Sequence, residues 1–204
     1  MRGGNVSICG QDASTLGRRE YATMVAMVAQ RSELARGFSV REVVAMGRAP
    51  HQGAWLRASH RDEQWVEEAL TVCRLTPLAE RLLDELSGGQ VQRVHLARAL
   101  CQRTPVLLLD EMAAHLDVRH AVAAYTLLKQ QQSARPLACV AVMHDLNAAA
   151  RYADQVVLLD HGEVVAAGPP RQVMTENQLA AVYRTPIISA EAADGQPYFV
   201  ARAG

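Results

Sequence analysis

Two apolar segments of strand length flank one helical segment, and each is followed at once by residues that can take part in chemistry. Residues 106–111 read Val-Leu-Leu-Leu-Asp-Glu, and residues 139–144 read Cys-Val-Ala-Val-Met-His. Unbroken apolar strands are typical of parallel sheets that are covered on both faces, and the helical pattern at about 118–132 supplies the crossover between them. The sequence therefore predicts a βαβ unit in an α/β fold.

The rest of the chain adds elements on both sides of this unit. Residues 5–9 alternate weakly and residues 24–28 are a short apolar run, so both predict strands. From about 39 to 85 the pattern becomes helical, with a capping box at Ser39 and Glu42. We expect an all-helical insertion within the α/β core.

Three later segments complete the secondary-structure prediction. Apolar residues after Gly89 recur at helical spacing, and strands at 156–159 and 163–167 flank Asp160-His161-Gly162 as in a hairpin. A last helix is predicted from a capping box at Thr175 and Gln178.

Composition narrows the class of protein. The 204 residues carry 21 basic and 21 acidic side chains, so the overall charge gives no reason to expect nucleic acid as a partner. No apolar run approaches the roughly 18 residues of a membrane-spanning helix. Four cysteines without a C-x-x-C pair suit a reducing cytoplasm.

The residues that follow the two apolar strands are the first candidates for a site. Carboxyl ends of parallel strands meet at one edge of a sheet, so we expect Asp110, Glu111 and His144 to lie there together. A carboxylate such as Asp110 can hold Mg²⁺, and Glu111 is then free to accept a proton from an attacking water. Equally, acid at a strand end can cap the next turn, and a lone histidine there can be structural.

A second candidate is the segment Leu-Ser-Gly-Gly-Gln at 86–90, which precedes a predicted helix. Bare glycine amides, a hydroxyl and the positive end of a helix dipole suit a phosphate group. The same three residues, Ser87, Gly88 and Gly89, also suit an ordinary turn.

These motifs together resemble the ATPase subunits of ABC transporters. Residues 86–100 are similar to the family's signature motif and its helix, and 106–111 to its Walker B strand. Leu116-Asp117 is similar to the D-loop, His144 to the switch histidine, and Gln30 to the Q-loop glutamine. The resemblance covers nearly the whole chain from about residue 5.

The resemblance implies a shared ATP site between two subunits that meet head to tail. It implies that Ser87, Gly88, Gly89 and Gln90 contact the γ-phosphate held by the opposite subunit, with Asp117 communicating between sites. It further implies ATP and Mg²⁺ as cofactors, with Mg²⁺ served by Asp110 and Gln30. Catalysis would then rest on three side chains, those of Glu111, His144 and Gln30.

One element of the family is not in the sequence. The G-x-x-x-x-G-K-[ST] loop, whose amides and lysine hold the phosphates, has no match, and the single lysine is Lys129 inside a predicted helix. We therefore expect an N-terminally truncated P-loop NTPase fold that does not hydrolyse ATP alone. A missing strand and helix would also leave a sheet edge and an apolar face uncovered, which favours aggregation.

The resemblance divides the chain into three parts. Residues 1–30 are expected to be the remnant of the N-terminal core, ending at the Q-loop, and 31–87 the helical subdomain. Residues 88–204 would hold the signature helix, Walker B, the D-loop, the switch histidine and the C-terminal hairpin and helix.

The segment 38–51 is similar to that of importers for iron siderophores, haem and cobalamin. This implies an ATP-binding subunit that energises iron-chelate import, in the cytoplasm at the inner face of the cell membrane. Its partners would be a second ATPase subunit in a homodimer, membrane-spanning permease subunits and a substrate-binding protein. The alternative is a non-catalytic remnant or partner that offers the signature motif in trans. The basic, histidine-rich insertion is either a solvated face or a permease-docking surface.

Overall fold

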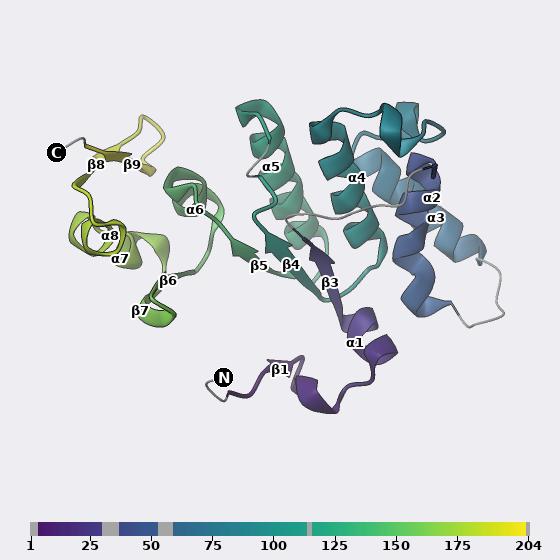
Figure 1. Ribbon diagram of the computed structural model, residues 1–204, viewed down its shortest axis with the longest axis horizontal. Coiled ribbons are helices and arrows are strands. Elements are labelled where there is room, and N and C mark those ends of the chain that lie inside the picture. Colours follow the sequence, from purple (N-terminus) through teal and green to yellow (C-terminus); the bar gives the residue numbers. More distant parts are fainter. Residues whose placement is uncertain (1–3, 30–36, 53–58, 114–115, 203–204) are drawn as a thin grey trace. The chain divides into compact units, whose positions relative to one another are not determined.

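The computed structural model describes residues 4–29, 37–52, 59–113 and 116–202 (Figure 1). The chain divides into two compact units, Met1–Val142 and Met143–Gly204. The three-part division expected from the sequence, with boundaries after residues 30 and 87, stays a prediction.

The first unit is built on a three-stranded parallel sheet in the order β3-β4-β5. Its strands are β3 (Val25–Val28), β4 (Val106–Asp110) and β5 (Ala138–Val142), and α5 (Val118–Ala134) connects the last two. The predicted strand at 24–28 and the predicted parallel βαβ unit are therefore confirmed.

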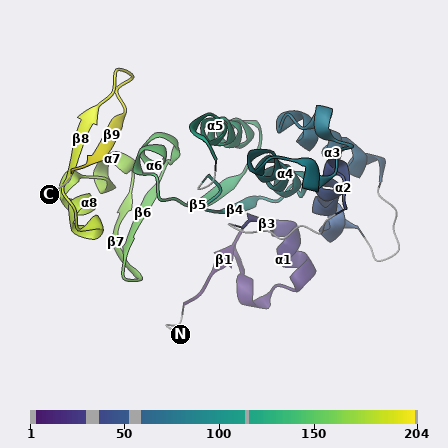
Figure 2. The same cartoon turned by 45° about the horizontal axis from the view of Figure 1, so that its top comes forward.

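The two faces of this sheet have different surroundings. Along one face lie Ala26 and Val28 of β3 and Leu107 and Leu109 of β4, all at most 4% exposed. They pack in one core with α4 (Gly88–Cys101) and α5, and Figure 2 shows both helices on the same side of the strands. On the opposite face Val25 is 6% exposed, whereas three other side chains are about half exposed: Met27 (50%), Val140 (61%) and Val142 (54%). Among the described residues, β5 pairs only with β4.

The N-terminal segment differs from its prediction. Instead of one strand over 5–9, a minimal hairpin joins β1 (Ser7–Ile8) to β2 (Gln11–Asp12). The chain turns at Cys9 and Gly10, both with positive φ, which ends the strand early. A short 3-10 turn, η1 (Ala13–Thr15), and helix α1 (Arg18–Met24) follow and had no clear periodic signal.

The expected helical insertion is present and begins as predicted. Ser39 and Glu42 form a capping box at the start of α2 (Val40–Ala45), and Ser59 and Asp62 form another at α3 (His60–Val72). Between and after them lie 3-10 turns, η2 (Met46–His51), η3 (Thr76–Leu78) and η4 (Leu83–Glu85). Pro77 lies in the first turn of η3, a position that suits its fixed φ.

The core of the first unit lies between the helices and the covered face of the sheet. Seven residues of this core have 0% exposure: Val40, Val43 and Val44 of α2, Leu70 of α3, Leu75 in the turn after α3, and Val94 and Ala97 of α4. This cluster continues without a break into β3, β4 and α5. The helical insertion and the sheet therefore share one core.

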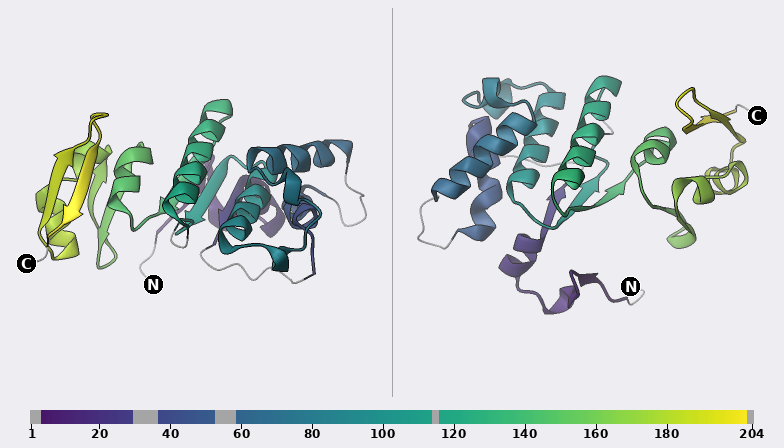
Figure 3. Two further views of the ribbon diagram at one scale, coloured as in Figure 1. Left: turned by 90° about the horizontal axis from the view of Figure 1, so that it is seen from above. Right: turned by 180° about the vertical axis from the view of Figure 1, so that it is seen from behind.

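The second unit, whose helices and strands are drawn in Figure 3, has a small hydrophobic core of its own. The predicted hairpin is confirmed as β6 (Val156–Asp160) with β7 (Glu163–Gly168), and the predicted late helix as α8 (Glu176–Tyr183). Elements that the sequence reading did not predict are α6 (Leu146–Tyr152), α7 (Pro170–Val173) and the hairpin of β8 (Ile187–Glu191) with β9 (Pro197–Ala201). The Asn147 side chain ties α6 to β9, since its amide donates to the Phe199 carbonyl (3.2 Å) and its oxygen accepts from the Phe199 amide (2.7 Å).

Candidate functional site

The Leu-Ser-Gly-Gly-Gln segment forms the amino-terminal end of α4, as predicted. Ser87 is the N-cap residue, and its backbone amide donates to Gln90 Oε1 at 2.9 Å. The Ser87 carbonyl accepts from the Gln90 and Val91 amides, each at 2.9 Å. A Cβ added at Gly88 would meet no atom within 4 Å, so the backbone there is open to a ligand. Gln90 acts in this structure as the reciprocal cap of its own helix.

The same helix end lies beside the amino-terminal end of α5. A Cβ at Gly89 would lie 3.7 Å from the Leu116 side chain and 3.8 Å from the His120 ring, which is ordinary contact distance. Asp117 is the N-cap of α5, and its Oδ1 accepts from the His120 backbone amide at 2.9 Å and lies 2.7 Å from His120 Nδ1. The structure thus brings the signature segment and Asp117 together within the first unit.

Asp117 is prepared to stay ionised. The His120 backbone amide is the largest of the contacts that hold the pKa of its carboxyl below the usual value, and the His120 ring and the Arg119 charge act in the same direction. The sequence reading missed His120. Its signal was the spacing of three residues from an N-cap aspartate, where a side chain returns to the cap.

Asp110 and Glu111 lie at the carboxyl end of β4, as predicted. Asp110 is the last residue of the strand and is half-buried, and its register partner is Val142. Glu111 turns away from the strand with φ of 48°, while its amide donates to the Val142 carbonyl at 3.3 Å. A left-handed conformation is uncommon for glutamate and is found disproportionately where backbone strain serves a site.

Two further residues predicted for the site are His144 and Gln30. His144 is exposed and belongs to the second unit, where the next residue, Asp145, caps α6 through its Oδ1 to the Asn147 and Ala148 amides (2.9 and 3.0 Å). Its expected place beside Asp110 and Glu111 stays a prediction. Gln30 lies outside the described residues.

The chemistry of these residues fits a nucleotide phosphate and Mg²⁺. The first turn of α4 presents the open backbone of Gly88 at the positive end of a 14-residue helix, a suitable environment for an anion. Mg²⁺ in phosphate sites commonly takes only one or two carboxylates and completes its shell with water and phosphate oxygens. Asp110 can supply such a carboxylate, and the described residues contain no group of three or more side chains that would form a closed metal cage.

The arrangement of the strands, the signature helix and the strand-end carboxylates defines a class of ATPase. The profile described as ABC transporter matches residues 1–114, and the chain belongs to this family. The Hemin import ATP-binding protein HmuV of Nocardia farcinica is 42% identical over 187 residues, which cover 90% of this chain and 63% of that protein. The Ferric enterobactin transport ATP-binding protein FepC of Escherichia coli is 35% identical over 180 residues, 88% of this chain and 66% of that protein.

Solved structures show the same fold. A metal-chelate type ABC transporter in an inward-facing conformation matches with a TM-score of 0.81 at 27% identity, over 88% of this chain and 72% of that one. The dimeric bacterial ABC transporter cassette MJ0796 matches with a TM-score of 0.72 at 27% identity, over 83% of this chain and 75% of that one. The predicted fold class, an ABC-type P-loop NTPase fold, is confirmed. The chain spans slightly less than two thirds of the length of the first curated relatives. Within the described ranges, no helix has the length and apolar character needed to cross a bilayer.

Proposed function

We propose that this chain supplies the signature, Walker B, D-loop and switch-histidine part of an ATP site in a subunit that drives an ABC importer. The observation that carries the proposal is the joint placement of Ser87–Gln90 and Asp117 at adjoining helix ends, in a unit whose central strand ends in Asp110 and Glu111. The importer activity, its cofactors and its partners all belong to the proposal.

Each side chain has a distinct role in this scheme. The Gly88 and Gly89 amides and the Ser87 hydroxyl bind the γ-phosphate of ATP held by the opposite subunit. The Gln90 side chain caps the helix by accepting a hydrogen bond from the Ser87 backbone amide. Asp110 holds Mg²⁺, together with Gln30. When bound, Mg²⁺ neutralises the charge that develops on the phosphate oxygens.

Proton transfer and water positioning are assigned to the remaining residues. Glu111 accepts a proton from the attacking water, and its backbone is in the left-handed region with φ of 48°. His144 holds the γ-phosphate and that water. Asp117, ionised and fixed by His120, transmits the state of one site to the other. In phosphoryl transfer, positioning and charge neutralisation of this kind supply most of the rate.

The names of the relatives support a proposal for the cargo and the assembly. Names of similar proteins include ferric enterobactin, hemin and siderophore transport. We propose an iron chelate, haem or a ferric siderophore, as the cargo, and a homodimer of ATPase subunits bound to permease subunits at the cytoplasmic face of the membrane. A substrate-binding protein would deliver the cargo.

The test adds the one element that the sequence lacks. A chimera with a strand, a G-x-x-x-x-G-K-[ST] loop and a helix ahead of residue 5 should hydrolyse ATP, whereas the chain by itself should not. Glu111→Gln in the chimera should lower kcat by at least about 10²-fold, as loss of a well-placed catalytic group does. Asp84→Asn, a matched change of an exposed carboxylate, should leave kcat unchanged. An active chimera that tolerates Glu111→Gln would remove Glu111 from this role.

A second candidate function is favoured by the open backbone at Gly88, which suits a phosphate group held by another subunit. On this view the chain is a non-catalytic partner that offers Ser87–Gln90 to an intact subunit. The unmodified chain would then bind a loop-containing ABC subunit in the presence of ATP, and Ser87→Ala with Gly88→Ala would weaken that binding. Failure to bind would exclude this candidate.

A further inference from the structure

We propose that the segment Gly47–His51 is a clamp on the carboxyl-terminal end of α4, with Arg48 as its central positioning residue. The clamp makes α2, α3 and the signature helix one body and connects that body to β3. In the sequence this segment was read as part of a basic surface for solvent or a permease. Arg48 is instead only 2% exposed.

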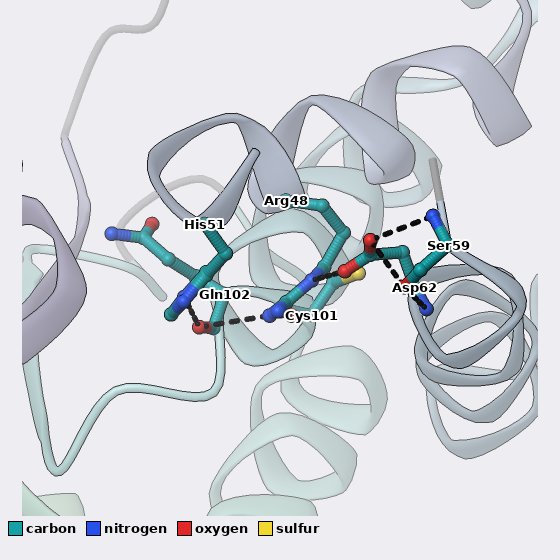
Figure 4. Close-up of polar contacts among 6 residues, drawn as sticks. All are labelled: Arg48, His51, Ser59, Asp62, Cys101 and Gln102. Atoms are coloured by element: carbon teal, nitrogen blue, oxygen red, sulfur yellow. Dashed lines mark hydrogen bonds and ion pairs between the residues drawn. The ribbon is translucent and has the colours of Figure 1, made fainter. Parts of the chain in front are cut away.

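The clamp satisfies carbonyls that a helix end leaves without partners. Arg48 Nη1 donates to the Cys101 carbonyl at 2.7 Å and to the Gln102 carbonyl at 3.1 Å, and His51 Nε2 lies 2.7 Å from the same Gln102 carbonyl (Figure 4). The last carbonyls of a helix carry its partial negative charge, so a guanidinium is the best-matched donor there. This cap is supplied by a separate segment, so it fixes where the helix lies as well as how it ends.

The guanidinium is itself held from the α3 side. Arg48 Nε donates to Asp62 Oδ1 at 2.8 Å, and the guanidinium carbon lies 4.0 Å from the centre of the Trp65 ring. The other Asp62 oxygen accepts from the Ser59 amide (3.0 Å) and hydroxyl (2.7 Å), as Figure 4 shows. With its position set by α3, Arg48 transmits any displacement of α3 to α4.

Gly47 lets the two backbones approach. A Cβ at this position would lie 2.3 Å from the Arg98 carbonyl oxygen, a separation that side-chain adjustment cannot relieve because the atom belongs to the backbone. Glycine is thus required for contact with α4.

Gln102 extends the connection to the sheet. Its side-chain amide donates to the Ala22 carbonyl (2.5 Å) and the Val25 carbonyl (3.1 Å), where α1 ends and β3 begins. Arg19 of α1 donates to the Pro50 carbonyl (3.0 Å) and the Gln52 carbonyl (2.9 Å). Three segments distant in sequence therefore meet at the end of α4.

The consequence concerns the opposite end of that helix. Fourteen residues at 1.5 Å each give a rod of about 20 Å, with Ser87–Gln90 at one end and the clamp at the other. Holding the far end restricts how the signature segment can swing. The importance of this orientation for ATP binding rests on the proposed function. The existence of the clamp does not depend on that function.

The test removes the clamp without leaving a buried charge. In the full chain, Arg48→Met with Asp62→Leu replaces the ion pair by apolar side chains, which commonly leaves stability nearly unchanged. Hydrogen exchange at residues 98–103 should become at least tenfold faster. Spin labels at positions 84 and 119, in a background with Cys9→Ser and Cys139→Ser, should give a broader distance distribution. Arg41→Met, which removes surface ion pairs to Glu67 and Glu80, is the matched control and should change neither.

Unchanged exchange and unchanged label distances in the double variant would overturn the proposal. So would faster exchange spread evenly over the first unit with a lower melting temperature, since that marks a general loss of stability. If the double variant does not fold, Gly47→Ala decides, with Gly4→Ala as its control because a Cβ there meets nothing. Local fraying of α4 in Gly47→Ala supports the clamp, and wild-type behaviour rejects it. These measurements are made without ATP, so their results test the clamp whether or not the proposed function is correct.

Discussion

The two faces of the β3-β4-β5 sheet are made from the same kinds of residue and have opposite surroundings. On one face Leu107 and Leu109 are 1% and 4% exposed beneath α4 and α5, while on the other Val140 and Val142 are 61% and 54% exposed. Parallel sheets are ordinarily covered on both faces. The sequence of an apolar strand therefore predicts that both of its faces are suited to burial. Which face is covered is seen only in the structure.

The difference also shows where the stability of the first unit comes from. The covered face continues into the helical insertion through α4, and the Arg48 clamp joins that helix to α2 and α3. We call the face with Leu107 and Leu109, together with the helices that cover it, the helical side, and the face with Val140 and Val142 the open face. Substitutions on the helical side should have large effects on stability, and substitutions on the open face should affect association instead.

Among the single substitutions, the largest effect is expected at Arg48. Arg48→Ala leaves Asp62, 7% exposed, without its charged partner and should lower the free energy of unfolding by about 3–5 kcal/mol. Arg41→Ala, at an exposed pair, should lower it by less than about 1 kcal/mol. Urea unfolding of both variants measures the contrast. Equal losses would show that the helical side gains nothing from its buried pair.

A direct comparison of the faces uses one substitution on each. Leu107→Ala should lower the free energy of unfolding by about 2–5 kcal/mol, because it leaves a cavity in close-packed surroundings. Val140→Ala should change it by less than about 0.5 kcal/mol. Chemical denaturation followed by circular dichroism distinguishes them. A large loss at Val140 would mean that the open face is covered in solution.

The helical side should also respond to pH through His95. Burial, reinforced by the Arg98 charge, lowers the pKa of this histidine from 6.5 to about 4, and its Nδ1 has no hydrogen-bond partner among the described residues. In the unfolded chain His95 becomes protonated below pH 6.5, whereas in the folded chain it becomes protonated only near pH 4. Stability present above pH 6.5 should thus fall as the pH drops through this window, by up to about 3 kcal/mol.

The matched variants for this pH effect are His95→Leu and His60→Gln. The free energy of unfolding is measured at several pH values. Its decrease at low pH should be mostly absent in His95→Leu and should remain in His60→Gln, because the His60 side chain is exposed. A fall that survives in His95→Leu would assign the effect to other groups.

The smallest effect on stability, with a large effect on association, is expected on the open face. Val140→Lys with Val142→Lys places charges on β5, which among the described residues pairs only with β4. It should leave the free energy of unfolding within about 0.5 kcal/mol while reducing light scattering at high concentration. The same two lysines at Leu107 and Leu109 should prevent folding. Unchanged scattering in the Val140/Val142 variant would show that this face does not drive association.

Much of the fold follows from local pattern. Apolar runs predicted β3, β4 and β5, and Ser39 with Glu42 predicted the start of α2, because a capping box and an unbroken strand are each encoded within a few residues. The strand predicted over 5–9 was wrong because the positive φ values at Cys9 and Gly10 reverse the chain. The β8-β9 hairpin was missed, since its strands alternate only weakly.

The positions of the candidate site residues in helices and strands were predicted in part for the same reason. Ser87–Gln90, Asp110, Glu111 and Asp117 lie at the helix and strand ends that their motifs indicate. What pattern does not encode is contact between distant segments. His120 beside Gly89, and Arg48 under the end of α4, depend on packing that joins residues far apart in the sequence.

The register of β3 with β4 sets the order in which the molecule can assemble. Val25 pairs with Val106, so β3 and β4 are neighbours in the sheet although the helical insertion and the whole of α4 separate them in the sequence. Closing a loop of that length is slow unless the intervening chain has already become compact, since the entropy of closure must be overcome before the pairing stabilises anything. The insertion and α4, rich in local contacts, are therefore expected to form first and to carry the two strands to each other, so that refolding kinetics should be sensitive to Leu70 before they are sensitive to Leu107.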